Sequence, residues 1–213
     1  MPFEAVNSKV VRAHVSPQTP VLARRGAMLG YSGQVTFRPV AGQGRGVTGL
    51  VGAALSGESN AMMATEGSGE VLYGYKGLHT TVLELDGAAP LVCEADRLLA
   101  HDAQLQTSVQ FIGSGGVRQA VSGAMTGQGL FTTNVHGRGA VALLSEGPII
   151  ALEVGPGADV VVDPDAYVGS YGQLQMSLVS GVSWKSLVGE GTGEPFSLRF
   201  AGSGVVYIQS AER

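Results

Sequence analysis

The feature that most constrains the fold of this chain is a sequence unit of about 70 residues that occurs three times. Each copy contains three apolar residues, a short polar corner, a second apolar pair and a small residue. The segments with this pattern are Pro20–Gly30, Pro90–Ala100 and Asp159–Gly169. They recur at offsets of 70 and 69 residues, and an internal repeat of this kind has to be found before any single element is assigned.

Two further signatures recur in the same order. A Gly-x-Gly pair followed by an alternating apolar segment begins at Gly67, Gly137 and Gly202, and about ten residues earlier stand Gly57-Glu58, Gly127-Gln128 and Gly193-Glu194. The common order predicts one domain, residues 1–213, made of repeats over residues 10–78, 79–147 and 148–213. We expect the two chain ends to complete one unit and so to close a pseudo-threefold ring.

Each unit has the sequence character of short β-strands. The segment Thr80–Leu85 alternates and is rich in Val, Thr and Leu, and it is followed by the turn pair Asp86-Gly87. Glycine makes up 33 of 213 residues, against roughly 7% in average proteins, and the glycines punctuate short apolar pairs. No long window keeps a period of 3.6. The sequence therefore predicts an all-β fold, a closed or ring-like barrel with little helix.

The segments that carry the repeat also resemble a known family. The chain is similar to the altered inheritance of mitochondria protein 24-like family, whose TRAP-like β-fold is that of the trp RNA-binding attenuation protein and is a form of double-stranded β-helix. The segments with this likeness are Gly127–Gly139, Val161–Gly169 and Gly193–Gly204. The first copy departs from it, since it lacks an aromatic residue where Phe131 and Phe196 stand. The resemblance implies a bacterial, non-catalytic, β-rich protein with fungal relatives in mitochondrial inner-membrane organisation.

Charge and cysteine content narrow the partners and the compartment. With 13 Lys and Arg against 17 Asp and Glu, the net charge is -4, which disfavours general binding to phosphate backbones. The single cysteine, Cys93, lies in an apolar run, where a free thiol acts as a small hydrophobe. We expect a cytoplasmic protein without a transmembrane segment, with peripheral membrane association left open.

A search for catalytic or metal-binding constellations finds none, so we expect no enzyme activity and no cofactor. A cupin-like metal site needs converging imidazoles and a carboxylate. The best local candidate is His79 with Glu84, but Thr81 stands where a second histidine is needed. The remaining histidines, His14, His101 and His136, stand alone, and each is interpreted as a structural or surface residue.

Two sets of recurring polar residues have more than one interpretation. Glu84 and Glu153 occupy equivalent positions in apolar strands; they either face solvent, which we favour, or are hydrogen-bonded inside, because an unpaired buried carboxylate is costly. Turn capping is the favoured role of the second set, and the alternative is a rim that contacts a partner. Its members are Glu58, Gln128 and Glu194.

The leading hypothesis is a non-enzymatic structural or scaffold protein that binds an unknown protein partner or itself. The alternative is a module that binds a small ligand or a glycan in a pocket. An RNA-binding protein and a cupin-like metalloenzyme are weaker candidates. Function depends on sites rather than on folds, so the likeness to an RNA-binding fold does not carry RNA binding with it.

Overall fold

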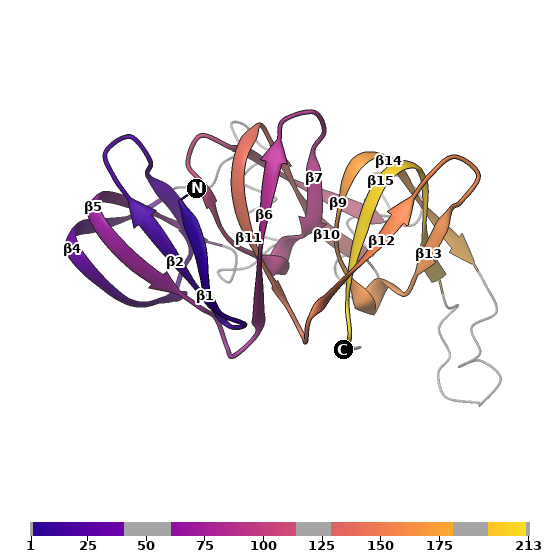
Figure 1. Ribbon diagram of the computed structural model, residues 1–213. Helices are drawn as coiled ribbons and strands as arrows, with labels where there is room; N and C mark the ends of the chain where they lie inside the picture. The colour runs from indigo at the N-terminus through magenta and orange to yellow at the C-terminus, as the bar shows by residue number, and fades with distance from the viewer. Residues whose placement is uncertain (1, 41–60, 114–128, 181–195, 212–213) are drawn as a thin grey trace.

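The chain forms β-strands almost throughout. The computed structural model describes residues 2–40, 61–113, 129–180 and 196–211. Within these ranges there are fifteen strands, two short 3-10 turns and no α-helix, so the predicted all-β class is confirmed. Three groups of strands lie in a row in Figure 1, from β4 and β5 at one end to β13 at the other. No helix in the described ranges has the length and apolar character of a membrane span.

The strands group into three units along the chain. The first unit is preceded by β1 (Phe3–Asn7) and consists of β2 (Val10–Val15), β3 (Val21–Arg24), β4 (Met28–Pro39) and β5 (Met62–Tyr73). The second comprises β6 (His79–Asp86), β7 (Leu91–Glu94), the turn η2 (Ala95–Arg97), β8 (Leu98–Asp102), β9 (Gln106–Gly113), β10 (Gly129–His136) and β11 (Arg138–Ser145). The third comprises β12 (Ile149–Val154), β13 (Val160–Val162), the turn η3 (Pro164–Ala166), β14 (Tyr167–Ser180) and β15 (Phe196–Gln209).

One antiparallel pairing order occurs in all three units. The long last strand, β5 or β15, pairs with the three other strands of its unit. In the second unit β10 and β11 share this role: β11 pairs with β6 and β8, and β10 with β7 and β9. The predicted repeat boundaries at residues 78/79 and 147/148 fall in the connections between these units. The assignment of residues 1–213 to a single domain stays a prediction.

The arrangement of the chain ends differs from the sequence expectation. β1 pairs with β2 in an eight-stranded sheet, whereas β15 belongs to a seven-stranded sheet. The expectation that the two ends complete one unit is therefore wrong. Each end already has strand partners within its own unit, so neither needs the other to satisfy its backbone.

Two joints between units hold the row together. The first joint is β3 against β8, with Ala23 opposite Ala100, and it carries the eight-stranded sheet from the first unit into the second. The second joint is β7 against β14, with Cys93 opposite Gly169. Each joint pairs the short second strand of one unit with the start of the next unit's long strand. When residues are matched by their position in the repeat, the two joints have the same register.

The Gly-x-Gly signature marks places where two long strands approach closely. A Cβ at Gly67 or Gly69 would lie 2.1 Å from a carbonyl oxygen of β4. A Cβ at Gly202 or Gly204 would lie 2.2 or 2.3 Å from a carbonyl oxygen of β14. Only glycine fits such contacts, which explains the signature in the first and third units.

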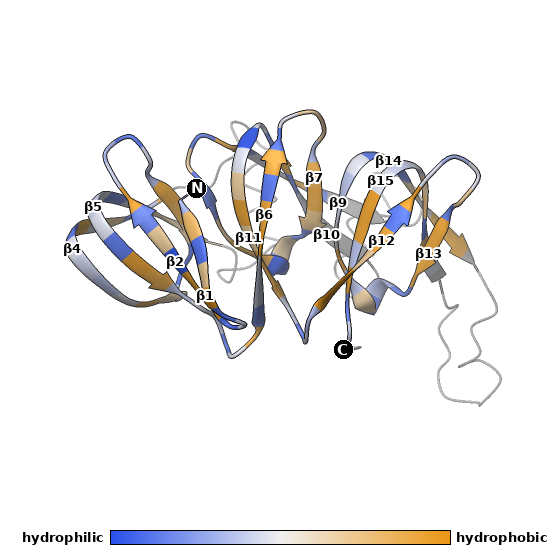
Figure 2. Ribbon diagram, in the orientation of Figure 1, coloured by the Kyte–Doolittle hydropathy of each residue, from blue (hydrophilic) through white to orange (hydrophobic). Residues whose placement is uncertain are grey.

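Each joint also links two cores. The cluster of the first unit includes Leu99 and Ala100 from β8, and the cluster of the second unit includes Val168 from β14. A fully buried aliphatic side chain contributes about 1.5–3 kcal/mol, so these residues stabilise the joint as well as the core. Among the described residues, the third cluster draws every member from β12 to β15. Figure 2 shows hydrophobic colour along the strands and hydrophilic colour in many of the turns.

Candidate interaction site

Exposed apolar side chains gather at the start of β4, where the first unit ends the row. Met28, Leu29 and Tyr31 are all exposed, and Tyr31 packs edge-on against Phe37 with 5.3 Å between ring centroids. Within the described residues, β4 has one strand neighbour, β5. We call residues 28–31 the β4 edge. Exposed apolar groups beside an unpaired strand edge are typical of an interaction surface.

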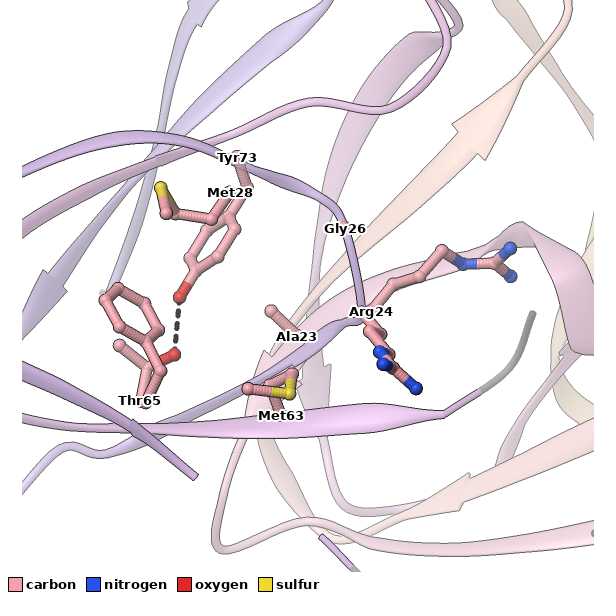
Figure 3. Close-up of a pocket in the computed structure, with 9 residues that line it drawn as sticks. Ala23, Arg24, Gly26, Met28, Met63, Thr65 and Tyr73 are labelled. Atoms are coloured by element: carbon pink, nitrogen blue, oxygen red, sulfur yellow. Dashed lines mark hydrogen bonds between the residues drawn. The ribbon is translucent and has the colours of Figure 1, made fainter. Parts of the chain in front are cut away.

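A cavity of about 300 Å³ lies beside the β4 edge, between β3, β4 and β5 (Figure 3). Its wall is mostly apolar and includes Met28, Met63 and Phe37. Two polar groups of the wall are paired with each other: Thr65 and Tyr73 share a hydrogen bond of 2.6 Å between their hydroxyl oxygens. Burial raises the pKa of Tyr73 to about 12, so its phenol stays neutral and can donate this bond.

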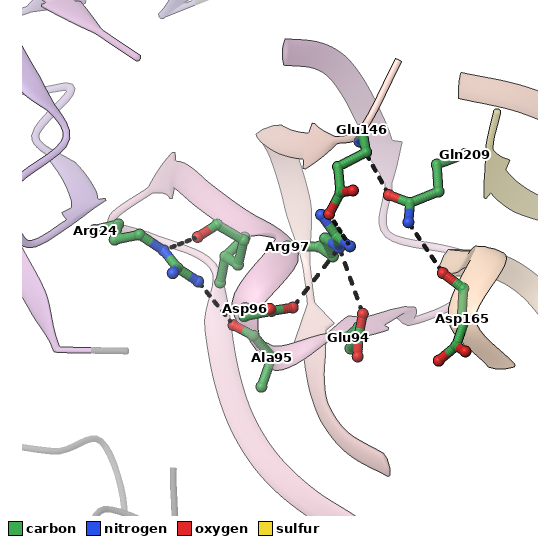
Figure 4. A network of polar contacts seen from close by, with 9 residues as sticks. Arg24, Glu94, Ala95, Asp96, Arg97, Glu146, Asp165 and Gln209 are labelled. Carbon is green, nitrogen blue, oxygen red and sulfur yellow. Dashed lines mark hydrogen bonds and ion pairs between the residues drawn. The ribbon is translucent and has the colours of Figure 1, made fainter. Parts of the chain in front are cut away.

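Arg24, at the rim of the cavity, connects the first unit to the second. Its buried guanidinium donates from Nε to the carbonyl oxygen of Leu98 at 3.2 Å and from Nη2 to that of Ala95 at 3.3 Å (Figure 4). It also lies 5.1 Å from the ring centroid of Tyr75. These bonds satisfy carbonyl groups of η2 and β8, so the arginine fastens the first joint.

A second buried arginine belongs to a network that links the second unit to the third. Arg97 forms ion pairs with Glu94 at 3.4 Å and with Glu146 at 3.3 Å. The backbone N–H of Glu146 donates to the side-chain amide of Gln209 at 3.0 Å, and that amide donates to the carbonyl oxygen of Asp165 at 3.0 Å (Figure 4). The network carries structural contacts across two units.

The edge at the opposite end of the row is β13, which we call the β13 edge. Val161 at its centre is exposed, whereas Val162 beside it is buried. Within the described part of the chain, β13 pairs with β15. Figure 2 shows β13 as a hydrophobic strand at the far end from β4. Within the described ranges, each end of the row therefore presents an apolar strand edge.

The structure tests some of the residues that the sequence singled out. Glu84 and Glu153 are exposed, which confirms the interpretation that they face solvent. The predicted rim residues Glu58, Gln128 and Glu194 lie outside the described residues.

The structure does not bring together the residues of the best metal-site candidate from the sequence, His79 and Glu84. His79 and Glu84 are both on β6, five residues apart, so their side chains point to opposite faces of the sheet. Among the described residues, no group of three His, Cys, Asp or Glu side chains lies together as a metal site would require.

The lone histidines take structural or surface places. His14 and His136 are exposed, and His14 lies 3.4 Å from Glu70 in a surface cluster of charges. His101 is buried in the first joint, where Nδ1 contacts the carbonyl oxygen of Asp102 at 2.7 Å. Burial lowers the pKa of His101, so the imidazole is neutral and can donate this bond.

Cys93 is fully buried in the second joint, as the apolar run around it predicts. Burial raises the pKa of its thiol to about 12, and the sulfur lies 3.7 Å from the carbonyl oxygen of Thr133. A thiol of this kind is an inert packing group, because nucleophilic attack needs the thiolate.

Sequence reasoning missed the β4 edge. The pair Met28-Leu29 aligns with Leu98-Leu99 and reads as core in every copy. The signal that could have found the edge is the order of the units, since the first and last of three linked units each keep an edge that the middle one covers.

Comparison with known proteins supports a family but gives no activity. A family model described as mitochondrial biogenesis AIM24 matches residues 3–211. The crystal structure of protein SPYM3_0169 from Streptococcus pyogenes is similar with a TM-score of 0.71 and 22% sequence identity, and the match covers 99% of this chain and 92% of that one. At this identity the likeness shows the fold alone. No curated protein matches the chain.

Proposed function

The chain belongs to the mitochondrial biogenesis AIM24 family, and we propose that it is a non-enzymatic interaction or scaffold protein that works through its exposed strand edges. The observation that carries this proposal is the β4 edge, where three large apolar side chains are exposed on one short segment. Exposed apolar surface is costly in water, and a strand edge offers backbone groups that a partner strand can pair with.

The buried polar and reactive groups support this proposal, because they make structural contacts within the protein. Two buried arginines that could otherwise bind an anionic substrate are engaged within the protein: Arg24 holds the first unit to the second, and Arg97 is paired with Glu94 and Glu146. The buried thiol of Cys93 packs in a core, and a chain with one unpaired cysteine suits a reducing compartment. We accordingly propose the cytoplasm as its location.

Site-specific photo-crosslinking in cells tests the proposal. A benzoylphenylalanine residue at position 28 is expected to give a covalent adduct, identified by mass spectrometry as a defined protein. The same residue at Val6, an exposed apolar position on β1, serves as the control and is expected to give much less adduct. Equal labelling at both positions, or none at position 28, would contradict an interaction role for the β4 edge.

The cavity of about 300 Å³ favours a second candidate, a small-ligand module. Its mostly apolar wall next to the exposed Arg25 suits a ligand with an apolar body and a carboxylate. Thermal-shift screening with apolar carboxylates tests this, with Met63→Trp as the variant that fills the cavity. A ligand that stabilises the wild type and not the variant would support it, since stabilisation follows the ligand's affinity for the folded state.

A further inference from the structure

The two internal joints show how this chain pairs one unit with the next. In the first joint Leu22 lies opposite His101, and in the second Val92 lies opposite Ser170. Both pairs occupy the same positions of the repeat. The corresponding third pair would join Val161, on the β13 edge, to Tyr31, on the β4 edge.

Each long strand begins with a β-bulge, and the side chain at this bulge is buried where the strand forms a joint. Leu99 and Val168, which interrupt the register of their strands as bulges, are 0% exposed, because each is inserted into the core of the preceding unit. Leu29 holds the same position in β4, with the same break in register, and is 59% exposed. The first unit thus carries an apolar side chain shaped for a core that it does not reach.

The third unit shows the complementary gap. Leu22 in the first joint is 5% exposed, whereas Val161, its counterpart in β13, is 57% exposed. Among the described residues, the third core cluster receives no side chain from another unit, whereas the first receives Leu99 and Ala100 from β8 and the second receives Val168 from β14. The β13 edge and the β4 edge therefore lack what the other supplies.

We propose that copies of this protein assemble head to tail, with the β13 edge of one copy pairing antiparallel with the β4 edge of the next. The register of the internal joints places Val160 opposite Ser32, Val161 opposite Tyr31 and Val162 opposite Gly30, and inserts Leu29 into the third core of the neighbouring copy. This inference rests on the proposed function of the strand edges and names a second copy as their partner.

The positions of the two edges require separate copies. β4 and β13 lie at opposite ends of the row in Figure 1 and belong to different sheets, so one chain cannot pair its own edges. A contact between two different surfaces is heterologous; repeated, it gives a closed ring or a filament.

Sterics and charge agree with this contact. Gly169 in the second joint is close to its partner strand, since a Cβ there would lie 3.0 Å from the carbonyl oxygen of Val92, and Gly30 holds the same position with open space around it. Arg24 reaches Ala95 in the first joint. The counterparts of these two residues are Asp163 and Arg25, both exposed and of opposite charge, so the proposed contact brings an attractive pair together.

Light scattering coupled to size-exclusion chromatography of the purified chain tests the proposal. The wild type is expected to have a mass of two or more chains. Val161→Lys and Tyr31→Glu should each reduce it to the mass of one chain, because a charge then faces an apolar partner at every contact. The double variant should regain the assembly, because Lys and Glu then lie directly opposite each other.

The control is Val6→Lys, which places the same charge on β1, the exposed end strand of the eight-stranded sheet, and should leave the mass unchanged. Circular dichroism checks that each variant is folded. A mixture of the two single variants should form an assembly in which they alternate, because the introduced lysine faces the introduced glutamate at one contact and Val161 faces Tyr31 at the next. A wild type with the mass of one chain at all concentrations would overturn the proposal. If position 28 still crosslinks to a different protein, the proposed function stands without self-assembly.

Discussion

The two internal joints have the same backbone register and different side-chain chemistry. In the first joint the strands carry His101 and Asp102, and the guanidinium of Arg24 crosses from β3 to the turn η2 and β8. In the second they carry Ser170 and Tyr171, and the phenol of Tyr167 donates to the carbonyl oxygen of Val92 at 3.0 Å.

The difference shows that the backbone register defines the joint, while side chains decide how firmly and under which conditions it holds. The first joint buries charged and titratable groups, so its strength depends on their hydrogen bonds and on pH. The second joint is fastened at its centre by a neutral phenol, whose ring stacks on Phe200 with 5.4 Å between centroids. Its strength should change little near neutral pH.

The largest expected effect comes from removing the charged donor of the first joint. Arg24→Met keeps much of the side-chain volume but leaves the carbonyl groups of Leu98 and Ala95 without this donor. We expect a loss of about 2–3 kcal/mol in the free energy of unfolding, measured by urea denaturation.

The matched control is Arg38→Met, which removes an exposed arginine paired with Glu66 at the surface and should cost about 0.5 kcal/mol. Equal losses from the buried and the exposed arginine would show that Arg24 does not fasten the first joint.

The equivalent test of the second joint is smaller. Tyr167→Phe keeps the ring on Phe200 and removes the hydrogen bonds of the hydroxyl to Val92 and Ser170. A loss of about 1 kcal/mol in the free energy of unfolding is expected. Tyr31→Phe, at an exposed ring, should have almost no effect on the same measurement, and a cost as large as that of Tyr167→Phe would refute the role of the buried hydroxyl.

The smallest effect separates the joints by pH. Burial lowers the pKa of His101 in the folded state, so the unfolded chain binds the proton more readily and stability is lost as pH falls through the ordinary histidine pKa of about 6.5. Between about pH 8 and pH 5 the melting temperature of the wild type should fall by about 2 °C more than that of His101→Asn.

Asparagine keeps a donor near the position of Nδ1 but does not titrate. Asp102, whose pKa burial raises, is present in both proteins, so the difference between them reports the imidazole. The idea fails if the two proteins respond to pH in the same way.

Much of the fold could be predicted from the sequence, because turn glycines and apolar triplets recur in a fixed order. The alternation of polar and apolar residues was enough to predict that Glu84 and Glu153 face solvent, and the apolar run around Cys93 was enough to predict that the thiol is buried. The joints were out of reach, since they depend on which strand of another unit lies alongside. Leu29 and Leu99 are both leucines at the same position of the repeat. Leu29 is exposed and Leu99 is buried because only Leu99 lies against a neighbouring unit.

The shared register of the two joints has a consequence for the ancestry of this chain. A protein of one unit would carry both halves of the joint, a short second strand and the start of a long strand, and could associate only with separate copies of itself. Joining three genes of that kind end to end would turn two of every three such contacts into contacts within one polypeptide, at fixed stoichiometry. At a contact within one polypeptide, the side chains would then be free to diverge, as His101 and Ser170 have done. At a contact between separate molecules, selection would keep the two strand edges complementary.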